Sequence, residues 1–276
     1  MISKICEAYH FASDINRNTI LYSETDGSIT TYSKGARTSR ISTSSSKKDV
    51  KFYPVDDYVF TATDCSGLAV FDREKSKQIY KYENENLHSH SYSNACILAS
   101  FDDYNIKFYD LKCRYLINSK PCANTQKVGW LDHFVYCYDG DSLRIFDFRD
   151  LENAVYKFQD ILDFTISGEY CFFIQESDKR KYLVQADPKS SERMYLRKEV
   201  QYKRIFTLKS QKSLVGILNN GLKIESNESI FEIKTENFVV SGLYFCENYG
   251  YLFSENSFFE IKNSFAEFVE NKVIKV

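Results

Sequence analysis

A short basic segment is the part of this sequence best suited to bind a charged ligand. Between Asp178 and Lys212 there are 11 lysines and arginines and 4 acidic residues, a net charge of +7. The whole 276-residue chain has a net charge of −2, so the remaining residues are acidic overall. Ammonium and guanidinium groups form charge-assisted hydrogen bonds with phosphate. The segment indicates either a site for an anionic partner or an ordinary solvated loop.

Residues that could act as nucleophiles or metal ligands do not have catalytic spacing. The sequence has no Gly-x-Ser-x-Gly, His-Glu-x-x-His or phosphate-loop motif, which predicts a protein that is not an enzyme and has no cofactor. His88 and His90 lack a cysteine or carboxylate at ligand spacing, so we predict no metal site. Eight cysteines form no Cys-x-x-Cys pair, and we interpret them as small buried residues of a reducing compartment. They are Cys6, Cys65, Cys96, Cys113, Cys122, Cys137, Cys171 and Cys246.

The elements that would position any site are short strands arranged in a repeat. In residues 99–110, Ile106 and Phe108 alternate with polar residues, which is the pattern of a strand with one buried face. An acidic turn precedes this strand and Asp110 closes it. The same outline closes seven times, with gaps of 39, 38, 37, 40, 39 and 36 residues. The closing residues are Ser33, Asp72, Asp110, Asp147, Asp187, Ser226 and Lys262.

A constant period near 40 residues is typical of WD repeats. We therefore predict an all-β fold, a seven-bladed WD-repeat β-propeller that forms a single domain over residues 1–276. A β-sandwich or barrel also has many short strands, but it has no reason to keep a constant period. The 21 tyrosines and 22 phenylalanines, with only 3 prolines, agree with many strands. We expect little helix and third strands that end near the closing residues.

Individual residues refine this expectation. Residues 1–33 are assigned to the first blade, with Asp26-Gly27 as a hairpin turn because glycine tolerates positive φ. Residues 34–48 are interpreted as a polar connector between blades. His88 is interpreted as a remnant of the Gly-His dipeptide that opens many WD repeats. Its expected hydrogen-bonding partner is Asp102.

The sequence gives no sign of a membrane or nucleic-acid partner. It has no apolar signal core at its N-terminus and no run that approaches the 18 apolar residues of a membrane helix. The net charge of −2 gives no global nucleic-acid signal, so we predict no direct nucleic-acid binding. A cytosolic or nuclear location is expected.

Several stretches, in order along the chain, resemble the Bub-three/Rae-one family of WD-repeat propellers. The stretch Asp-Gly-Ser-Ile-Thr-Thr-Tyr is similar to the family's first-blade Asp-Gly-Ser-Val-Arg-Leu-Tyr, for example, and Leu-Arg-Ile-Phe-Asp-Phe-Arg-Asp resembles its Val-Leu-Val-Trp-Asp-Leu-Arg-Asn. The family's blade tryptophans are missing, because Thr25 and Phe101 occupy their positions. The matching stretches are residues 26–32, 100–112, 143–150, 183–198 and 240–250.

The resemblance implies a non-enzymatic adaptor of the mitotic spindle-assembly checkpoint. It implies a monomeric propeller within a complex, in the nucleus and at kinetochores with a cytoplasmic pool. The implied partners are a Glu-rich helical motif of a checkpoint kinase or nucleoporin, and a phosphothreonine peptide of a kinetochore scaffold. Messenger-RNA export at the nuclear pore, and ribosome biogenesis, are the alternative functions.

Four residues carry these roles if the resemblance is followed position by position. Arg149 would pair with glutamates of the helical motif and Phe101 would supply apolar contact, so both should reach one face of the propeller. Arg149 could instead form a structural pair with a neighbouring aspartate. Arg180 and Lys198 match the two basic positions that hold phosphothreonine, and both lie in the basic segment.

The predicted strand pairing would bring the two phosphate-binding residues together. If the chain returns antiparallel after the Asp187-Pro188 turn, opposite residues lie roughly 5 Å apart and can converge on one anion. The competing interpretation is that Arg180, Lys181 and Lys198 only solvate an exposed blade edge and discourage edge pairing.

Overall fold

The structure is a computed structural model that describes most of the 276 residues. The chain divides into two compact units, residues 10–157 and residues 1–9 with 158–276. The described residues are 2–6, 13–16, 19–24, 26–33, 36–43, 45, 47, 49–54, 56–83, 86–93, 97–167, 170–187, 196–208, 213–226, 230–235, 240–245, 250–254, 258–262, 265, 268 and 273–274.

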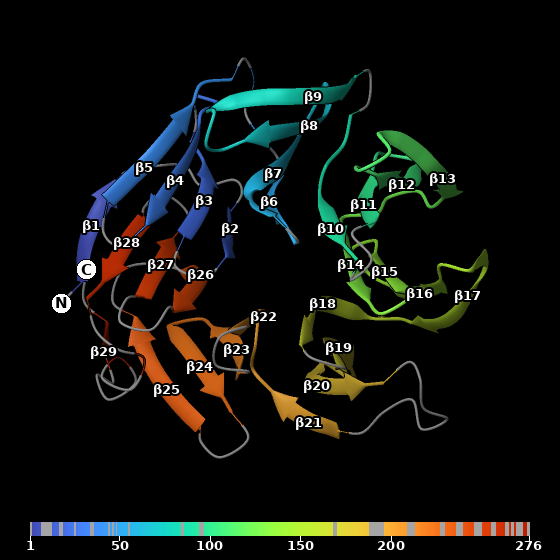
Figure 1. Ribbon diagram of the computed structural model, residues 1–276. Coiled ribbons are helices and arrows are strands. Elements are labelled where there is room, and N and C mark those ends of the chain that lie inside the picture. The colour runs from blue at the N-terminus through green and yellow to red at the C-terminus, as the bar shows by residue number, and fades with distance from the viewer. Residues whose placement is uncertain are drawn as a thin grey trace. The chain divides into compact units, whose positions relative to one another are not determined.

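The unit of residues 10–157 contains four antiparallel four-stranded sheets, each made of consecutive strands (Figure 1). The first is β2 (Ser13–Asn16), β3 (Thr19–Ser23), β4 (Ile29–Ser33) and β5 (Ala36–Ile41). The second is β6 (Asp49–Tyr53), β7 (Asp56–Asp64), β8 (Gly67–Asp72) and β9 (Lys77–Glu83). The third is β10 (His90–Tyr92), β11 (Ile97–Phe101), β12 (Asn105–Asp110) and β13 (Tyr115–Pro121). The fourth is β14 (Lys127–Leu131), β15 (Phe134–Tyr138), β16 (Leu143–Asp147) and β17 (Asp150–Phe158).

The sheets of this unit pack face to face through apolar side chains. The first strands of consecutive sheets are in contact, β2 with β6, β6 with β10 and β10 with β14. Between the first two sheets, Leu21, Val50, Phe60 and Phe71 form one buried cluster. Packed four-stranded meanders of this kind are the blades of β-propellers.

The other unit has the same organisation, with two additions. One sheet consists of four consecutive strands, β18 (Ile161–Ser167), β19 (Tyr170–Ser177), β20 (Arg180–Ala186) and β21 (Leu196–Val200). A second sheet contains the next four, β22 (Arg204–Leu208), β23 (Ser213–Leu218), β24 (Gly221–Glu225) and β25 (Ile230–Thr235). The short β29 (Val273–Ile274) adds to β25 in parallel. The remaining sheet combines β26 (Val240–Phe245), β27 (Gly250–Ser254) and β28 (Phe258–Ile261) with the N-terminal strand β1 (Ile2–Cys6).

The all-β class and the propeller-type sheets are as predicted from the repeat. The third strands β4, β8, β12 and β16 end at the predicted closing residues, and β20, β24 and β28 end one residue earlier. Helical backbone is described at Phe265 and Phe268. The assignment of residues 1–33 to one blade is wrong at its start, because Ile2–Cys6 pairs with β28. A repeat period fixes spacing along the chain, and it does not show which edge a terminal strand joins.

The turns between second and third strands in residues 10–157 share one device. In each, an aspartate carboxylate accepts a hydrogen bond from a backbone N–H two or three residues further on, which is the Asx turn expected of aspartate. The four bonds run from Ser28 N to Asp26 (2.8 Å), Ser66 N to Asp64 (2.7 Å), Tyr104 N to Asp102 (2.8 Å) and Ser142 N to Asp139 (2.6 Å).

Candidate functional site

Phe101 does not reach a surface. It ends β11 with 1% of its side chain exposed and belongs to a buried cluster with Phe108 and Trp130. Its ring also stacks on His88, with ring centroids 5.5 Å apart. The expectation that Phe101 offers apolar contact to a partner is therefore wrong, because the side chain is used to pack sheets together.

Arg149 lies at the surface just after β16, with 69% of its side chain exposed. Its Nε donates to Asp147 Oδ1 at 2.9 Å and its Nη2 donates to Asp147 Oδ2 at 2.6 Å. These hydrogen bonds lower the pKa of Asp147 to about 2. Arg149 thus forms the pair with a neighbouring aspartate that was the alternative to peptide binding, but its side chain stays largely exposed to solvent. A role in peptide binding stays a prediction, without the paired contribution of Phe101.

Arg180 and Lys198 do not converge. In the pairing of β20 with β21, Leu183 lies opposite Lys198 and Tyr182 lies opposite Glu199. Since successive side chains of a strand point to opposite faces, Lys198 shares the face of Leu183 and Arg180 shares the face of Tyr182. The predicted shared anion site is wrong for this register, whereas phosphate binding by either residue alone stays a prediction.

The surroundings of the two cations also differ. Lys198 Nζ lies 2.7 Å from Oε2 of the part-buried Glu225, whose other oxygen, Oε1, accepts a hydrogen bond from the Tyr202 hydroxyl. Arg180 is 64% exposed, and its nearest acidic partner is Glu199 at 3.7 Å. On Arg180's face, the Arg197 guanidinium lies over the Tyr182 ring at 4.2 Å. The exposed cations of this sheet are therefore Arg180 and Arg197, rather than Arg180 and Lys198.

The two histidines near β10 take structural positions. His88 Nε2 lies 2.8 Å from Asp103 Oδ1, so the expected partner Asp102 is wrong by one residue. Asp102 instead caps its own turn and pairs with Lys107 at 3.1 Å. His90 Nε2 lies 2.8 Å from Thr61 Oγ1, which links the second and third sheets.

The cysteines are only partly buried as predicted. The structure describes five cysteine side chains as free thiols, of which Cys122, Cys137 and Cys171 are buried and Cys65 and Cys113 are exposed. A hydrogen bond from Cys137 lowers the pKa of Cys122 to about 6.

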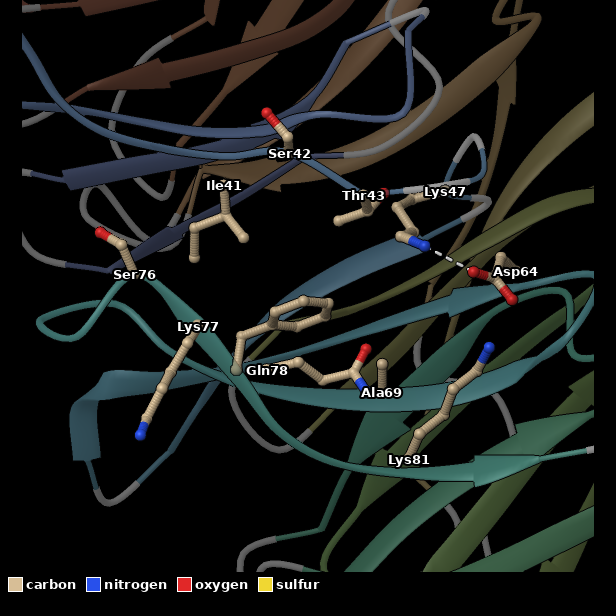
Figure 2. Close-up of a pocket in the computed structure, with 11 residues that line it drawn as sticks. Ile41, Ser42, Thr43, Lys47, Asp64, Ala69, Ser76, Lys77, Gln78 and Lys81 are labelled. Atoms are coloured by element: carbon tan, nitrogen blue, oxygen red, sulfur yellow. Dashed lines mark hydrogen bonds and ion pairs between the residues drawn. The ribbon is translucent and has the colours of Figure 1, made fainter.

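A cavity that the sequence did not indicate lies in residues 10–157, between the connector after β5 and the strands β8 and β9 (Figure 2). Its volume is about 290 Å³. The lining is mostly polar and includes three lysines with one aspartate. The lining residues are Ile41, Ser42, Thr43, Lys47, Asp64, Ala69, Phe71, Ser76, Lys77, Gln78 and Lys81.

Asp64 is the centre of a buried network at one end of this cavity. Its Oδ2 accepts hydrogen bonds from Lys47 Nζ at 2.5 Å and Ser45 Oγ at 2.6 Å. Its Oδ1 accepts from the backbone N–H and the hydroxyl of Ser66, at 2.7 and 2.6 Å. Burial opposes the negative charge, but these four hydrogen bonds outweigh it and hold the pKa of Asp64 well below its ordinary value. Lys47 is only 4% exposed, so the two charges are paired out of water.

The sheet geometry places two further donors on the cavity side. Ala69 lies opposite Lys81, and Phe71 lies opposite Gln78. Simple alternation would put positions 78 and 81 of β9 on opposite faces. A register irregularity between Val70 and Phe71 shifts the count by one, so that both side chains share the face of Ala69 and Phe71. In Figure 2 the Lys81 ammonium is directed toward Asp64.

The sequence carried little signal for this cavity. Lys47 lies in the polar connector 34–48, and Asp64 looks like every other turn aspartate. Gln78 and Lys81 come to one face only because of the irregularity in pairing. A search for sequence spacing could not have found it.

Neither a scan against protein-family models nor a search of the curated proteins gave a match. Among the described side chains, no group of three or more His, Cys, Asp or Glu is placed to hold a metal ion. In the same part of the chain, no helix is both long and apolar enough to cross a membrane.

Proposed function

We propose that this chain is a non-enzymatic scaffold that binds protein partners. The observation that carries the proposal is the series of antiparallel meanders in each unit, in which the first strands of consecutive sheets are in contact. This is the construction of β-propellers, and propellers of the WD-repeat class present loops and outer strands to other proteins. The fold alone names no partner, so the partner must be argued from exposed residues.

We also propose that the seven sheets close into one seven-bladed ring. The N-terminal strand β1 supports this, because it is the fourth strand of the C-terminal sheet, which otherwise consists of β26, β27 and β28. Such pairing ties the first residues to the last sheet. A single 276-residue domain has an expected radius of gyration of about 19 Å. Small-angle scattering that gave a clearly larger value would contradict one closed ring.

The more specific proposal is a spindle-checkpoint adaptor in the nucleus and at kinetochores. It rests on the resemblance of the blade sequences and on two exposed cations, Arg149 and Arg180, at the positions the resemblance assigns. Arg149 would exchange Asp147 for a partner glutamate. Arg180 would contact phosphothreonine together with Arg197, because these two share a face and Lys198 does not.

A binding experiment with two labelled peptides tests this assignment. We expect Arg149→Glu to weaken a Glu-rich helical peptide by about tenfold or more, since a charged interface hydrogen bond contributes about 2–5 kcal/mol. Arg37→Glu makes the same charge change on an exposed residue of β5 and should have little effect. Equal effects of the two substitutions would contradict the checkpoint assignment.

The second peptide, Met-Glu-Leu-Thr, is compared with and without phosphate on threonine. Preference for the phosphorylated form, lost in Arg180→Ala with Arg197→Ala and kept in Lys198→Ala, is the expected result. Equal binding of the phosphorylated and unphosphorylated peptides would contradict the proposal of a phosphothreonine partner at kinetochores. Affinity capture from mitotic extract then distinguishes checkpoint kinases from the nucleoporins or preribosomal proteins of the alternative functions.

A further inference from the structure

In the network beside Asp64, Lys81 has no acidic partner among the described side chains. Asp64 already accepts four hydrogen bonds, which fills the acceptor positions of a carboxylate. Its charge is paired with Lys47 at 2.5 Å. Lys81 is linked to this pair only through a hydroxyl, because its Nζ donates to Ser66 Oγ at 2.5 Å. The network of Lys47, Asp64 and Lys81 therefore has a net charge of +1.

The donors around the cavity exceed the acceptors. An ammonium has three N–H groups, and within the described residues one hydrogen bond from Lys81 is found, the one to Ser66. The Gln78 amide shares its face, and the described residues include no hydrogen-bonding partner for it. The hydroxyl of Thr43 already donates to backbone oxygen of Gly27. Among the described residues, this leaves a part-buried ammonium with two N–H groups that have no acceptor, on the same face as an amide that can also donate.

We propose that this cavity binds a small oxyanion, the phosphate or carboxylate group of a small molecule, with Lys81 and Gln78 as its donors. The volume of about 290 Å³ corresponds to about ten water molecules, which is room for a small organic anion and too little for a folded segment. Ser66 holds the Lys81 ammonium in place, and the Lys47–Asp64 pair fixes Ser66. This site is separate from the surface cations assigned to protein partners, so it extends the proposed function.

The chain offers a matched control for the test. Lys77 is on the same strand as Lys81 and also lines the cavity, but it lies opposite Asp72 and so belongs to the other face of the register. In Figure 2 its ammonium points away from Lys47 and Lys81. Lys77→Met and Lys81→Met therefore make the same change in charge and differ only in which ammonium is lost.

The experiment is calorimetric titration of the full chain with glycerol 3-phosphate, inorganic phosphate and acetate, and with glycerol as the neutral control. We expect saturable binding of at least one oxyanion with a Kd of about 1 mM or tighter, weakened by added salt, and none of glycerol. The phosphate and acetate arms decide which oxyanion is preferred. Absence of saturable binding by all three oxyanions would overturn the proposal.

The variants localise the site. Lys81→Met should weaken binding by about tenfold or more, and Lys77→Met by less than about twofold. Gln78→Leu, at an exposed side chain, should keep the fold and weaken binding to a smaller degree, which preserves the test if Lys81→Met is unstable. Equal losses for Lys77→Met and Lys81→Met, or unchanged affinity in Gln78→Leu, would show that any anion binds elsewhere.

Discussion

The Asp64 and Asp102 turns have the same local structure and different surroundings. Each aspartate accepts a backbone hydrogen bond from the residue two positions later, at 2.7 and 2.8 Å. Lys107 reaches Asp102 from the next strand of the same sheet and is 17% exposed, whereas Lys47 reaches Asp64 from the connector after the neighbouring sheet and is 4% exposed. The turn therefore forms from residues next to one another in the sequence, whereas the buried ion pair beside the cavity also needs Lys47 from the connector after the neighbouring sheet.

The largest expected consequence of this difference is in stability. Lys47→Met should lower the free energy of unfolding by about 3–5 kcal/mol, because it leaves a buried carboxylate without its counter-ion. Lys107→Met removes the same charge from a more exposed pair and should cost about 1 kcal/mol or less. Urea titration of both variants measures the two losses under the same conditions.

A double variant shows whether the loss comes from the stranded charge. Lys47→Met combined with Asp64→Leu removes both charges and should recover a large part of the stability lost in Lys47→Met, since buried pairs can often be replaced by apolar residues. If Lys47→Met cost no more than Lys107→Met, the two turns would be equivalent and the comparison would fail.

A somewhat smaller effect is expected at the glycine that packs against the Asp64 network. Gly27 has φ +86°, and a Cβ there would lie 2.7 Å from the backbone oxygen of Ser45. Gly140 in the fourth sheet has φ +98°, but its Cβ would meet the movable side chain of Gln126. Both alanine variants should lose about 1–3 kcal/mol through backbone strain, with Gly27→Ala near the upper end.

The effect of Gly27→Ala on the Asp64 network can also be measured at a single residue, Ser66. Displacing the Ser45 backbone should disturb the hydrogen bond from Ser45 Oγ to Asp64. Amide chemical shifts at Ser66, which bonds the same carboxylate, should therefore change in Gly27→Ala and stay unchanged in Gly140→Ala. If Gly27→Ala and Gly140→Ala lost the same stability and the Ser66 amide shift did not change, Gly27 would not affect the Asp64 hydrogen-bond network.

The sequence predicted the sheets well because their signal is local and repeated. Alternation such as Ile106 and Phe108, and a closing residue every 36–40 positions, placed all third-strand ends to within one residue. The N-terminal strand was misassigned because its partner β28 lies at the other end of the chain.

The candidate sites were harder to predict because they depend on register and packing. Phe101 was expected at a surface, and it is buried because its side chain faces the neighbouring sheet. Arg180 and Lys198 were expected to converge, and a three-position offset in register places them on opposite faces. The cavity depends on a register irregularity that alternation cannot show, at Val70 and Phe71.

Acid should weaken the Asp64 network, and the sign follows from its pKa. The folded-state pKa of Asp64 lies below its ordinary value of 3.8, because hydrogen bonds to the carboxylate outweigh burial. The unfolded chain therefore binds the proton more readily, so the stabilisation is complete above about pH 5 and is lost as the pH falls toward the folded-state pKa. The gap in stability between wild type and Asp64→Asn should shrink from pH 5 to pH 2.

Asp102→Asn provides the parallel measurement on the other turn. The pKa of Asp102 is also lowered, since backbone hydrogen bonds and Lys107 outweigh partial burial. The gap for Asp102→Asn should shrink in the same direction and be smaller at every pH, because Asp102 is more exposed. Thermal unfolding across this pH range gives both gaps, and a pH-independent gap for Asp64→Asn would contradict the assignment of a charged Asp64.

The smallest effect on stability is expected at the Asp147–Arg149 pair, whose arginine is largely exposed to solvent. Arg149 is 69% exposed, so solvent screens its charge and Arg149→Ala should leave the melting temperature nearly unchanged. The same substitution removes the hydrogen bonds that lower the pKa of Asp147 to about 2. That pKa should therefore rise toward 3.8 in Arg149→Ala, as measured by carboxyl carbon chemical shifts during an acid titration. Added salt should raise it in the wild type as well, in proportion to screening. An Asp147 pKa that did not respond to Arg149→Ala would mean that Arg149 is not held by Asp147 in solution, and its guanidinium would then be free for a partner without first breaking this pair.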